Sequence, residues 1–437
     1  QQAWEWAADH GDVERLRQSA NALSRYLSLR GLYGTGERLF HRAAAALEMR
    51  PAAAGPAAEA ADLIYTLMRG QLLLFEARFL NLQGEHERVF AVADAAGALF
   101  EQALAKAQAE DIRELAITCR SNLGNIAVLK HDFIAARDHL EAALQLYRQS
   151  DEPLIEANLL NDLGTVMMLY GDHAAARRYL ERGLQACRRA GNRMGEVLAN
   201  LNLGRVANAV GLCDDAQRYF DDALHISRSL GDERLEAQVL TGLALLHYHK
   251  GDYNAAWETS HSALQIAEAA SNRPAEAEAL IISGDALLEL GMTAEAKTAY
   301  QRALDIYEGL DQPMLALEPR AGLALVALAE KQPGMAAAHL DEILRHLTTT
   351  KEKTLSLERL QGVRDPFRIC ATCIRVLRAL RSRRARDCTE AAYRFLKDRA
   401  GRISDPALRR TFMRQVPANR QIVEAYQADE RSHAARL

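Results

Sequence analysis

The sequence LNLGRVANAVGLCDDAQRYFDDA, residues 201–223, is one of six copies of a pattern that recurs every 40 residues between Leu115 and Leu347. Small residues hold three fixed positions in these copies. They are Gly124, Gly164, Gly204, Ala244, Gly284 and Ala324; then Ala136, Ala176, Ala216, Ala256, Ala296 and Ala336; then Ala143, Gly183, Ala223, Ala263 and Ala303, with Ile343 as the exception. Small residues let two helix backbones approach closely, and a fixed period of this length is typical of a helical solenoid. The pattern therefore predicts an array of stacked helix pairs.

Glycine followed by aspartate or asparagine marks the ends of the expected helices. Glycine adopts the left-handed conformation that closes a helix, and the next side chain accepts a hydrogen bond from the free amides of the following helix. The four pairs are Gly171-Asp172, Gly191-Asn192, Gly231-Asp232 and Gly251-Asp252. Two helices and their turns therefore fill each period.

Weaker signals extend the array in both directions, since Phe40 and Ala43 repeat the spacing of Phe220 and Ala223. We expect one continuous solenoid domain in four parts: residues 1–50 with the N-terminal helices and first repeat, 51–110 with a second, irregular repeat, 111–348 with six regular repeats, and 349–437 with a linker, the last helix pair and a cap. We expect helices over 13–29, 34–47, 57–82, 86–107, 366–380 and 385–400, a loop at Pro51–Pro56, a short helical piece near Leu357 and two short final helices.

Composition favours a water-soluble protein of the cytoplasm. Hydrophobic residues make up 49% of the 437 residues, but no apolar run reaches the roughly 18 residues that would cross a bilayer. The six cysteines are spread through helical sequence rather than packed as in a disulfide-rich secreted domain. The chain begins at Gln1 with neither an initiator methionine nor a signal-peptide pattern, so we expect it to be part of a longer polypeptide.

The repeats resemble tetratricopeptide repeats, and the segments Ser121-Asn122-Leu123-Gly124 and Leu201-Asn202-Leu203-Gly204 are similar to the long subtype found in kinesin light chains. The ends resemble arrays in signal-transduction ATPases with numerous domains (STAND proteins). The motifs concerned are Trp4-x-Trp6-Ala7 with His10-Gly11-Asp12, Arg30-Gly31-Leu32-Tyr33, Asp405-Pro406-Ala407-Leu408-Arg409-Arg410-Thr411-Phe412 and Val416-Pro417. This resemblance implies an all-α fold: a right-handed superhelical solenoid of antiparallel helix pairs with C-terminal capping helices.

The resemblance also implies a sensor, in which the array binds an inducer in its concave groove and relieves autoinhibition of an upstream nucleotide-binding module. The inducer would be a peptide, a protein or a small polar molecule, and other domains of the full-length chain would be partners. The alternative is a constitutive scaffold or co-chaperone-like adaptor that binds protein tails. The sequence lacks the phosphate-binding motif Gly-x-x-x-x-Gly-Lys-Ser/Thr and any catalytic motif, so we expect no enzyme activity, no cofactor and no membrane partner.

Polar residues at equivalent repeat positions are the candidate binding residues. Spacings of three and four place them on one stripe of the first helix of each pair, where amide side chains could hold an extended peptide. The candidates are Asn122, Asn125, Asn158, Asp162, Asn202, Arg205, Gln238, Tyr248 and Asp285. The row is interrupted at Gly242, Ile282 and Gly322. The competing interpretation is that these residues are solvated surface or bridge neighbouring helices.

Two further features favour structural roles. Cys370-x-x-Cys373 lies within an expected helix, and Cys388 does not complete a four-ligand zinc site, so we expect core cysteines and no metal. We also expect His247 to pack and His249 to be exposed. Residues 364–437 hold 18 Lys and Arg against 8 Asp and Glu, a local charge of +10 that leaves −14 for residues 1–363. The basic residues alternate with apolar ones, which favours a face docked on the acidic array over nucleic-acid binding.

Overall fold

A computed structural model describes residues 2–49, 56–83, 85–109, 112–147, 153–348, 355–360 and 363–434. Within these ranges the regular structure is entirely helical, with 21 α-helices and one short 3-10 helix. Of the predicted loop at Pro51–Pro56, residues 51–55 lie outside the described residues, and Pro56 instead begins a helix. Contacts divide the chain into two compact units, which are considered separately below. The N-terminal unit runs to Leu169 and includes Arg182–Asn192, and the C-terminal unit holds Tyr170–Glu181 and the chain from Arg193 onward.

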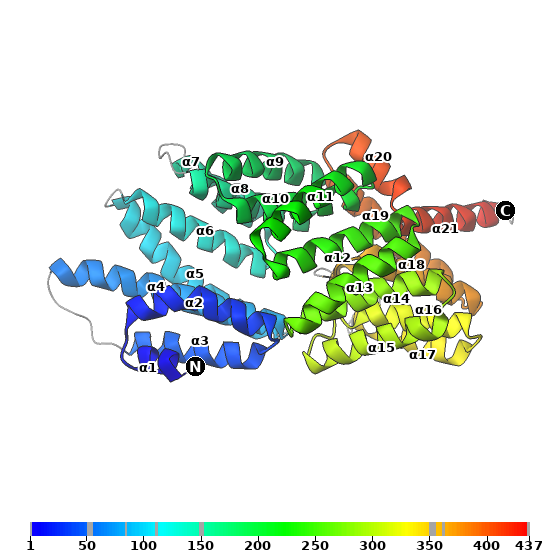
Figure 1. Cartoon of the computed structure of the whole chain (residues 1–437), viewed down its shortest axis with the longest axis horizontal. Helices are drawn as coiled ribbons and strands as arrows, with labels where there is room; N and C mark the ends of the chain where they lie inside the picture. Colours follow the sequence, from blue (N-terminus) through cyan, green and yellow to red (C-terminus); the bar gives the residue numbers. More distant parts are fainter. Residues whose placement is uncertain are drawn as a thin grey trace. The chain divides into compact units, whose positions relative to one another are not determined.

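The N-terminal unit is built from helices that pack against their neighbours in the chain (Figure 1). Its helices are α1 (Gln2–Asp9), α2 (Val13–Leu29), α3 (Tyr33–Glu48), α4 (Pro56–Leu82), α5 (His86–Ala109), α6 (Arg113–Leu129), α7 (Phe133–Tyr147) and α8 (Pro153–Tyr170). Here α3 contacts α4, α4 contacts α5, and α5 contacts α6. The helices expected at the start of the chain are present within two residues of their expected ends.

The C-terminal unit continues with the same pairing. Its helices are the first part of α9 (His173–Arg189), α10 (Arg193–Ala209), α11 (Cys213–Leu230), α12 (Glu233–Lys250), α13 (Tyr253–Ala269), α14 (Arg273–Glu289), α15 (Thr293–Gly309), α16 (Leu317–Ala329) and α17 (Pro333–Leu347). The first helices of successive pairs also touch, since α10 contacts α12, α12 contacts α14, and α14 contacts α16. The expected all-α architecture of tandem helix pairs is confirmed.

Glycine and aspartate set the helix ends as expected. Gly231 and Gly251 close α11 and α12 with φ angles of 65° and 82°. The side chains of Asp232 and Asp252 then accept hydrogen bonds from the amides of Leu235 and Ala255, at 3.0 and 3.2 Å. A side-chain acceptor at this position satisfies an amide that the helix itself leaves unpaired.

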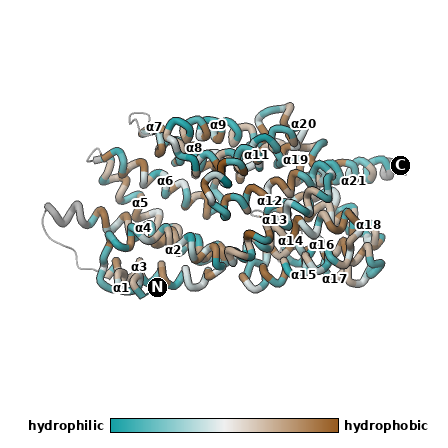
Figure 2. Tube along the Cα trace, viewed as in Figure 1, coloured by the Kyte–Doolittle hydropathy of each residue, from teal (hydrophilic) through white to brown (hydrophobic). Residues whose placement is uncertain are grey.

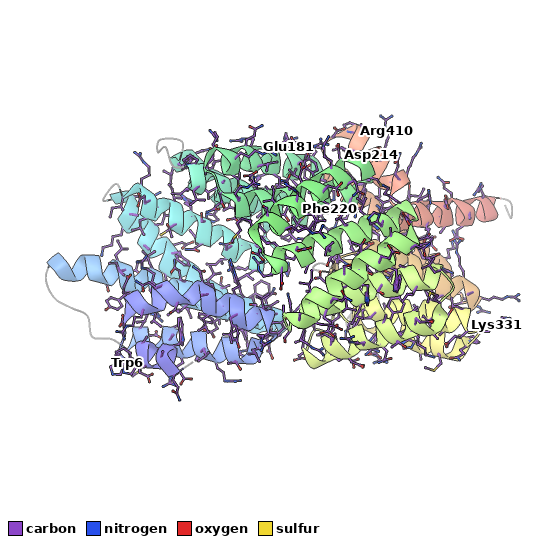
Figure 3. All side chains as sticks on the ribbon, viewed as in Figure 1. Trp6, Glu181, Asp214, Phe220, Lys331 and Arg410 are labelled. Carbon is purple, nitrogen blue, oxygen red and sulfur yellow. The ribbon has the colours of Figure 1, made fainter. Side chains whose placement is uncertain are left out.

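Close packing between pairs depends on glycines that face aromatic rings. Phe220 of α11 is fully buried, and the labelled ring lies among the helices in Figure 3. A Cβ atom added to Gly204 or Gly242 would come within 2.6 Å of Phe220 Cε1. Gly284 and Gly322 receive the ring of Tyr300 in the same way. Two of the three interruptions in the predicted polar row, Gly242 and Gly322, are therefore needed for packing.

After α17 the chain forms η1 (Leu357–Leu360), α18 (Pro366–Ala379), α19 (Arg384–Arg402), α20 (Pro406–Gln415) and α21 (Pro417–Ala434). One apolar cluster joins Leu340 and Ile343 of α17 to Ile369 of α18 and Leu396 of α19, and it reaches Val210 in the turn after α10. Hydrophilic and hydrophobic residues alternate along these helices (Figure 2). The expectation of two short final helices is wrong for α21, which has 18 residues, because its apolar side chains Ile422 and Ala425 continue the contact with this cluster.

Candidate binding site

In the N-terminal unit, the predicted binding residues lie on two successive first helices. Asn122 and Asn125 on α6 are half-buried, and Asn158 and Asp162 on α8 are exposed. Leu159, Leu160 and Leu163 on the same helix are buried, so α8 turns one face to the core and presents the other as polar surface. The four side chains therefore place amide and carboxylate groups at the surface of this unit.

Arg78 on α4 is an additional residue on this surface, and it is exposed. It stands 40 residues before Thr118 and 80 before Asn158, so extending the repeat period backwards into the irregular repeat would have identified it. The protein around Asp162 raises the pKa of its carboxyl to about 6, and Arg78 opposes that rise. The same surroundings lower the pKa of Arg78. Both groups are open to solvent yet surrounded by enough protein to be partly desolvated.

In the C-terminal unit, three predicted residues remain accessible on α10 and α12. Arg205 is exposed, and Asn202 and Gln238 are half-buried. Desolvation lowers the pKa of Arg205, Glu278 on α14 opposes that effect, and Arg364 adds to it. The surface of α10 and α12 therefore presents the guanidinium of Arg205 and the side-chain amides of Asn202 and Gln238.

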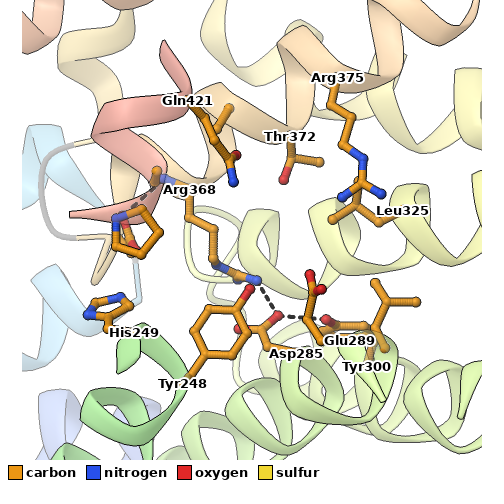
Figure 4. Close-up of a pocket in the computed structure, with 15 residues that line it drawn as sticks. Tyr248, His249, Asp285, Glu289, Tyr300, Leu325, Arg368, Thr372, Arg375 and Gln421 are labelled. Atoms are coloured by element: carbon orange, nitrogen blue, oxygen red, sulfur yellow. Dashed lines mark hydrogen bonds and ion pairs between the residues drawn. The ribbon is translucent and has the colours of Figure 1, made fainter. Parts of the chain in front are cut away.

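Asp285 on α14 has a different environment from the other predicted residues, since it is 4% exposed. The hydroxyl of Tyr300 donates to its Oδ1 atom at 2.6 Å, and the guanidinium of Arg368 on α18 donates to the same oxygen. The prediction placed Asp285 on the accessible binding surface, and the structure covers it instead. The reason is that α18 packs on α16 and carries Arg368 onto α14 (Figure 4).

Glu318 at the start of α16 is the second carboxylate under α18, with 3% exposure. Its Oε1 atom accepts from the backbone amide of Arg364 and its Oε2 atom from the Arg364 side chain, both at 2.9 Å. Arg368 Nη2 lies 3.6 Å from the same Oε2 atom. Burial alone would raise the pKa of Glu318, but Arg364 and Arg368 bring it below its ordinary value. The two arginines and two carboxylates form one charge-balanced cluster.

A cavity of about 60 Å³ adjoins this cluster, lined in part by Tyr248, His249, Asp285, Arg368 and Thr372 (Figure 4). Tyr248 is half-buried, and burial raises the pKa of its hydroxyl. His249 was predicted to be exposed, but its Nδ1 atom lies 2.9 Å from the side-chain oxygen of Asn208 and its ring faces the C-terminal segment. Both residues therefore border the cluster rather than open surface.

The basic C-terminal segment uses several arginines in contacts within its own unit. Arg378 pairs with Asp429 at 2.7 Å, and Arg402 donates to the backbone oxygen of Tyr170 at 3.1 Å. Others, such as Arg410, extend away from the helices (Figure 3). The contact between Arg402 and Tyr170 fits the interpretation of a docked face.

The six cysteines, all among the described residues, form no disulfide bond; five of them are buried and Cys213 is partly buried. Within the described ranges, no group of three or more His, Cys, Asp or Glu residues is arranged to hold a metal ion. No helix in the same ranges combines the length and hydropathy required to cross a bilayer. The predictions of no metal site and no membrane partner stay predictions.

Comparison with known proteins supports the repeat assignment. Residues 155–229, 195–258 and 235–309 match the tetratricopeptide repeat family. A search of curated protein sequences gave no match.

Solved structures share the fold at low sequence identity. The apo form of RapI superposes with a TM-score of 0.58 and 11% identity, over 97% of this chain and 98% of that one. NprR in complex with its cognate peptide NprX superposes with a TM-score of 0.50 and 16% identity, over 80% of this chain and 98% of that one. A STAND protein with a tetratricopeptide repeat sensor from Pyrococcus horikoshii superposes with a TM-score of 0.48 and 14% identity, over 86% of this chain and 55% of that one. The STAND assignment stays a prediction. Residues 155–309 contain tetratricopeptide repeats.

Proposed function

We propose that this chain is a ligand-binding repeat module that holds an extended peptide or protein segment along the polar side chains of its first helices. The observation that carries the proposal is that polar side chains on first helices are accessible or half-buried, Asn122 and Asn158 in the N-terminal unit and Asn202 and Arg205 in the C-terminal unit. An asparagine amide both donates and accepts hydrogen bonds, so it can pair with a peptide backbone whatever the ligand sequence. Within one unit, side chains on successive first helices repeat that contact along the ligand.

Two further points support a peptide ligand. NprR, which shares the fold, was solved with a cognate peptide. Charged side chains accompany the amides in each unit, Arg78 and Asp162 in the N-terminal unit and Arg205 in the C-terminal unit, and these charges would add selectivity to backbone recognition. The finer proposal is a sensor, in which ligand binding relieves autoinhibition of a nucleotide-binding module upstream in a cytoplasmic protein. A small polar inducer would use the same side chains.

The test uses short peptides that are selected for binding to this chain from a display library of random peptides. Replacing Asn122 and Asn202 together by leucine, N122L/N202L, removes two backbone-pairing amides, and we expect peptide affinity to fall by about tenfold or more. The control is Q145L, which makes the same kind of change at an exposed position on α7, a second helix. Isothermal titration calorimetry measures affinity, and thermal unfolding confirms that each variant is folded.

Equal binding by N122L/N202L and the parent chain would exclude this surface as the binding site. The single variants N122L and N202L assign any loss to the N-terminal or C-terminal unit. Weaker binding by Q145L as well would indicate a nonspecific effect of added apolar surface.

A further inference from the structure

The first turn of α18 and the residues just before it lie on the first helices of the last two regular repeats. Arg364 bonds Glu318 through both its backbone amide and its side chain, and Arg368 bonds Asp285. In sequence Arg368 lies 83 residues from Asp285, and Arg364 lies 46 from Glu318. The chain therefore folds back here and packs on its own array.

The carboxylates under this segment hold the same repeat positions as the accessible polar residues. Asp285 is equivalent to Asn125 and Arg205, and Glu318 is equivalent to Asn158 and Gln238. Arg205 and Asn158 are exposed, whereas Asp285 and Glu318 are 4% and 3% exposed. The chain's own residues thus occupy the surface that a ligand would use elsewhere in the array.

The contact between charged side chains leaves some of their buried polar atoms without a hydrogen bond. Among the described residues, Asp285 Oδ2, Arg364 Nε and Nη1, and Arg368 Nε are buried without a hydrogen-bond partner. The small cavity beside Asp285 lies between the side chains of the two surfaces. Buried polar groups in a protein core are normally hydrogen-bonded, so this contact is less completely bonded than a core contact.

We propose that the segment from Val363 to Arg375 is an internal competitor: it occupies the first-helix surface of α14 and α16 and must move away before a ligand can extend along it from α10 and α12. This deepens the proposed function, because the surface that it blocks is the one assigned to the ligand. A ligand that binds only the released state shifts the population toward that state. The array would then change its C-terminal contacts when it binds.

Thr372 supplies a reporter position for this movement. It is 4% exposed and lines the cavity between α18 and α14. A cysteine placed there, T372C, can react with a maleimide only when α18 moves off the array. Cys370 and Cys373 in the same helix are buried, and both approach Cys388 of α19, so their labelling would report unfolding of the C-terminal helices instead. Mass spectrometry resolves the three sites.

The first arm compares T372C with T372C/R364Q/R368Q, which removes both guanidinium groups from the carboxylates. We expect labelling at position 372 to accelerate by about tenfold or more, with Cys370 and Cys373 still protected. The matched control, T372C/R410Q/R414Q, removes two exposed arginines of α20 and should label like T372C alone. If the first variant labels at all three cysteines, it has unfolded, and T372C/R364Q, which keeps the backbone bond to Glu318, gives the result.

The second arm adds to T372C a selected peptide whose binding is weakened by N202L. The expected result is again faster labelling at position 372. Unchanged labelling in either arm overturns the proposal. If no such peptide exists, the proposed function fails in the C-terminal unit, while the first arm still decides whether the segment is releasable.

Discussion

The α8 surface of the N-terminal unit and the α14 surface of the C-terminal unit occupy the same place in the repeat but have opposite environments. Asn158 and Asp162 on α8 face solvent, whereas Asp285 on α14 is covered by Arg368. The difference does not come from the helices themselves, because both belong to regular 40-residue repeats. It comes from the basic segment that returns onto the later repeats. A polar residue on a first helix therefore lies at the open surface or in a buried ion pair according to what packs on it.

The largest effect that separates the two surfaces is expected from removing their arginines. R368M should lower the free energy of unfolding by about 3–5 kcal/mol, because it leaves Asp285 buried without its counter-charge. R78M, which removes the exposed arginine near Asp162, should cost less than about 1 kcal/mol. Urea denaturation measures both. A similar cost for the two variants would show that the cluster under α18 is no more important for stability than a surface pair.

Much of the fold could be predicted from local signals. Gly-Asp pairs set helix ends, and the 40-residue period placed the pairs, because both act over a few residues or between neighbours in the array. The cover over Asp285 had no such signal. Arg368 contacts it across 83 residues, and an arginine in an amphipathic helix looks the same in sequence whether it meets solvent or a carboxylate. The excess positive charge of residues 364–437 indicated docking on the acidic array but not which repeats it would cover.

The candidate site was predictable to the same extent. Asn122 and Asn202 could be found because they share a repeat position, and Asn158 because it lies on the same stripe of the first helix. The structure leaves all three accessible or half-buried. Arg78 was missed because its repeat is irregular, although the period of 40 residues still holds there. The interruptions at Gly242 and Gly322 could be seen in the sequence, but their reason could not, since it lies in rings contributed by Phe220 and Tyr300.

The next effect tests why the polar row stops at Gly242. The variant G242A should lower the free energy of unfolding by about 1–3 kcal/mol, because its new methyl group would overlap the ring of Phe220, whose Cε1 atom lies 2.6 Å from that position. The control G309A adds a methyl group where nothing lies within 4 Å, so it should leave stability unchanged or raise it by up to about 1 kcal/mol. If G242A were as stable as the parent, packing would not explain the interruption.

The smallest effect concerns pH, and its sign should differ between the two surfaces. Desolvation raises the pKa of Asp162 from 3.8 to about 6, so its carboxyl favours the folded state when protonated, and that contribution is lost as pH rises from about 4 to 6. Glu318 behaves in the opposite way. Its pKa is lowered from 4.5 by Arg364 and Arg368 against the effect of burial, so its contribution is present above pH 4.5 and is lost as pH falls below that value.

Neutral variants isolate these two contributions. Relative to the parent chain, D162N should gain stability as pH rises from about 4 to 7. E318Q should be less stable than the parent at pH 7, and this deficit should shrink as the medium becomes more acidic, because the parent then protonates Glu318 and loses the same ion pairs. Urea unfolding of each variant beside the parent across this pH range measures both trends. If the two variants followed the same trend, the carboxylates of α8 and α16 would share one environment, and the contrast between an open surface and one covered by the chain's own arginines would not hold.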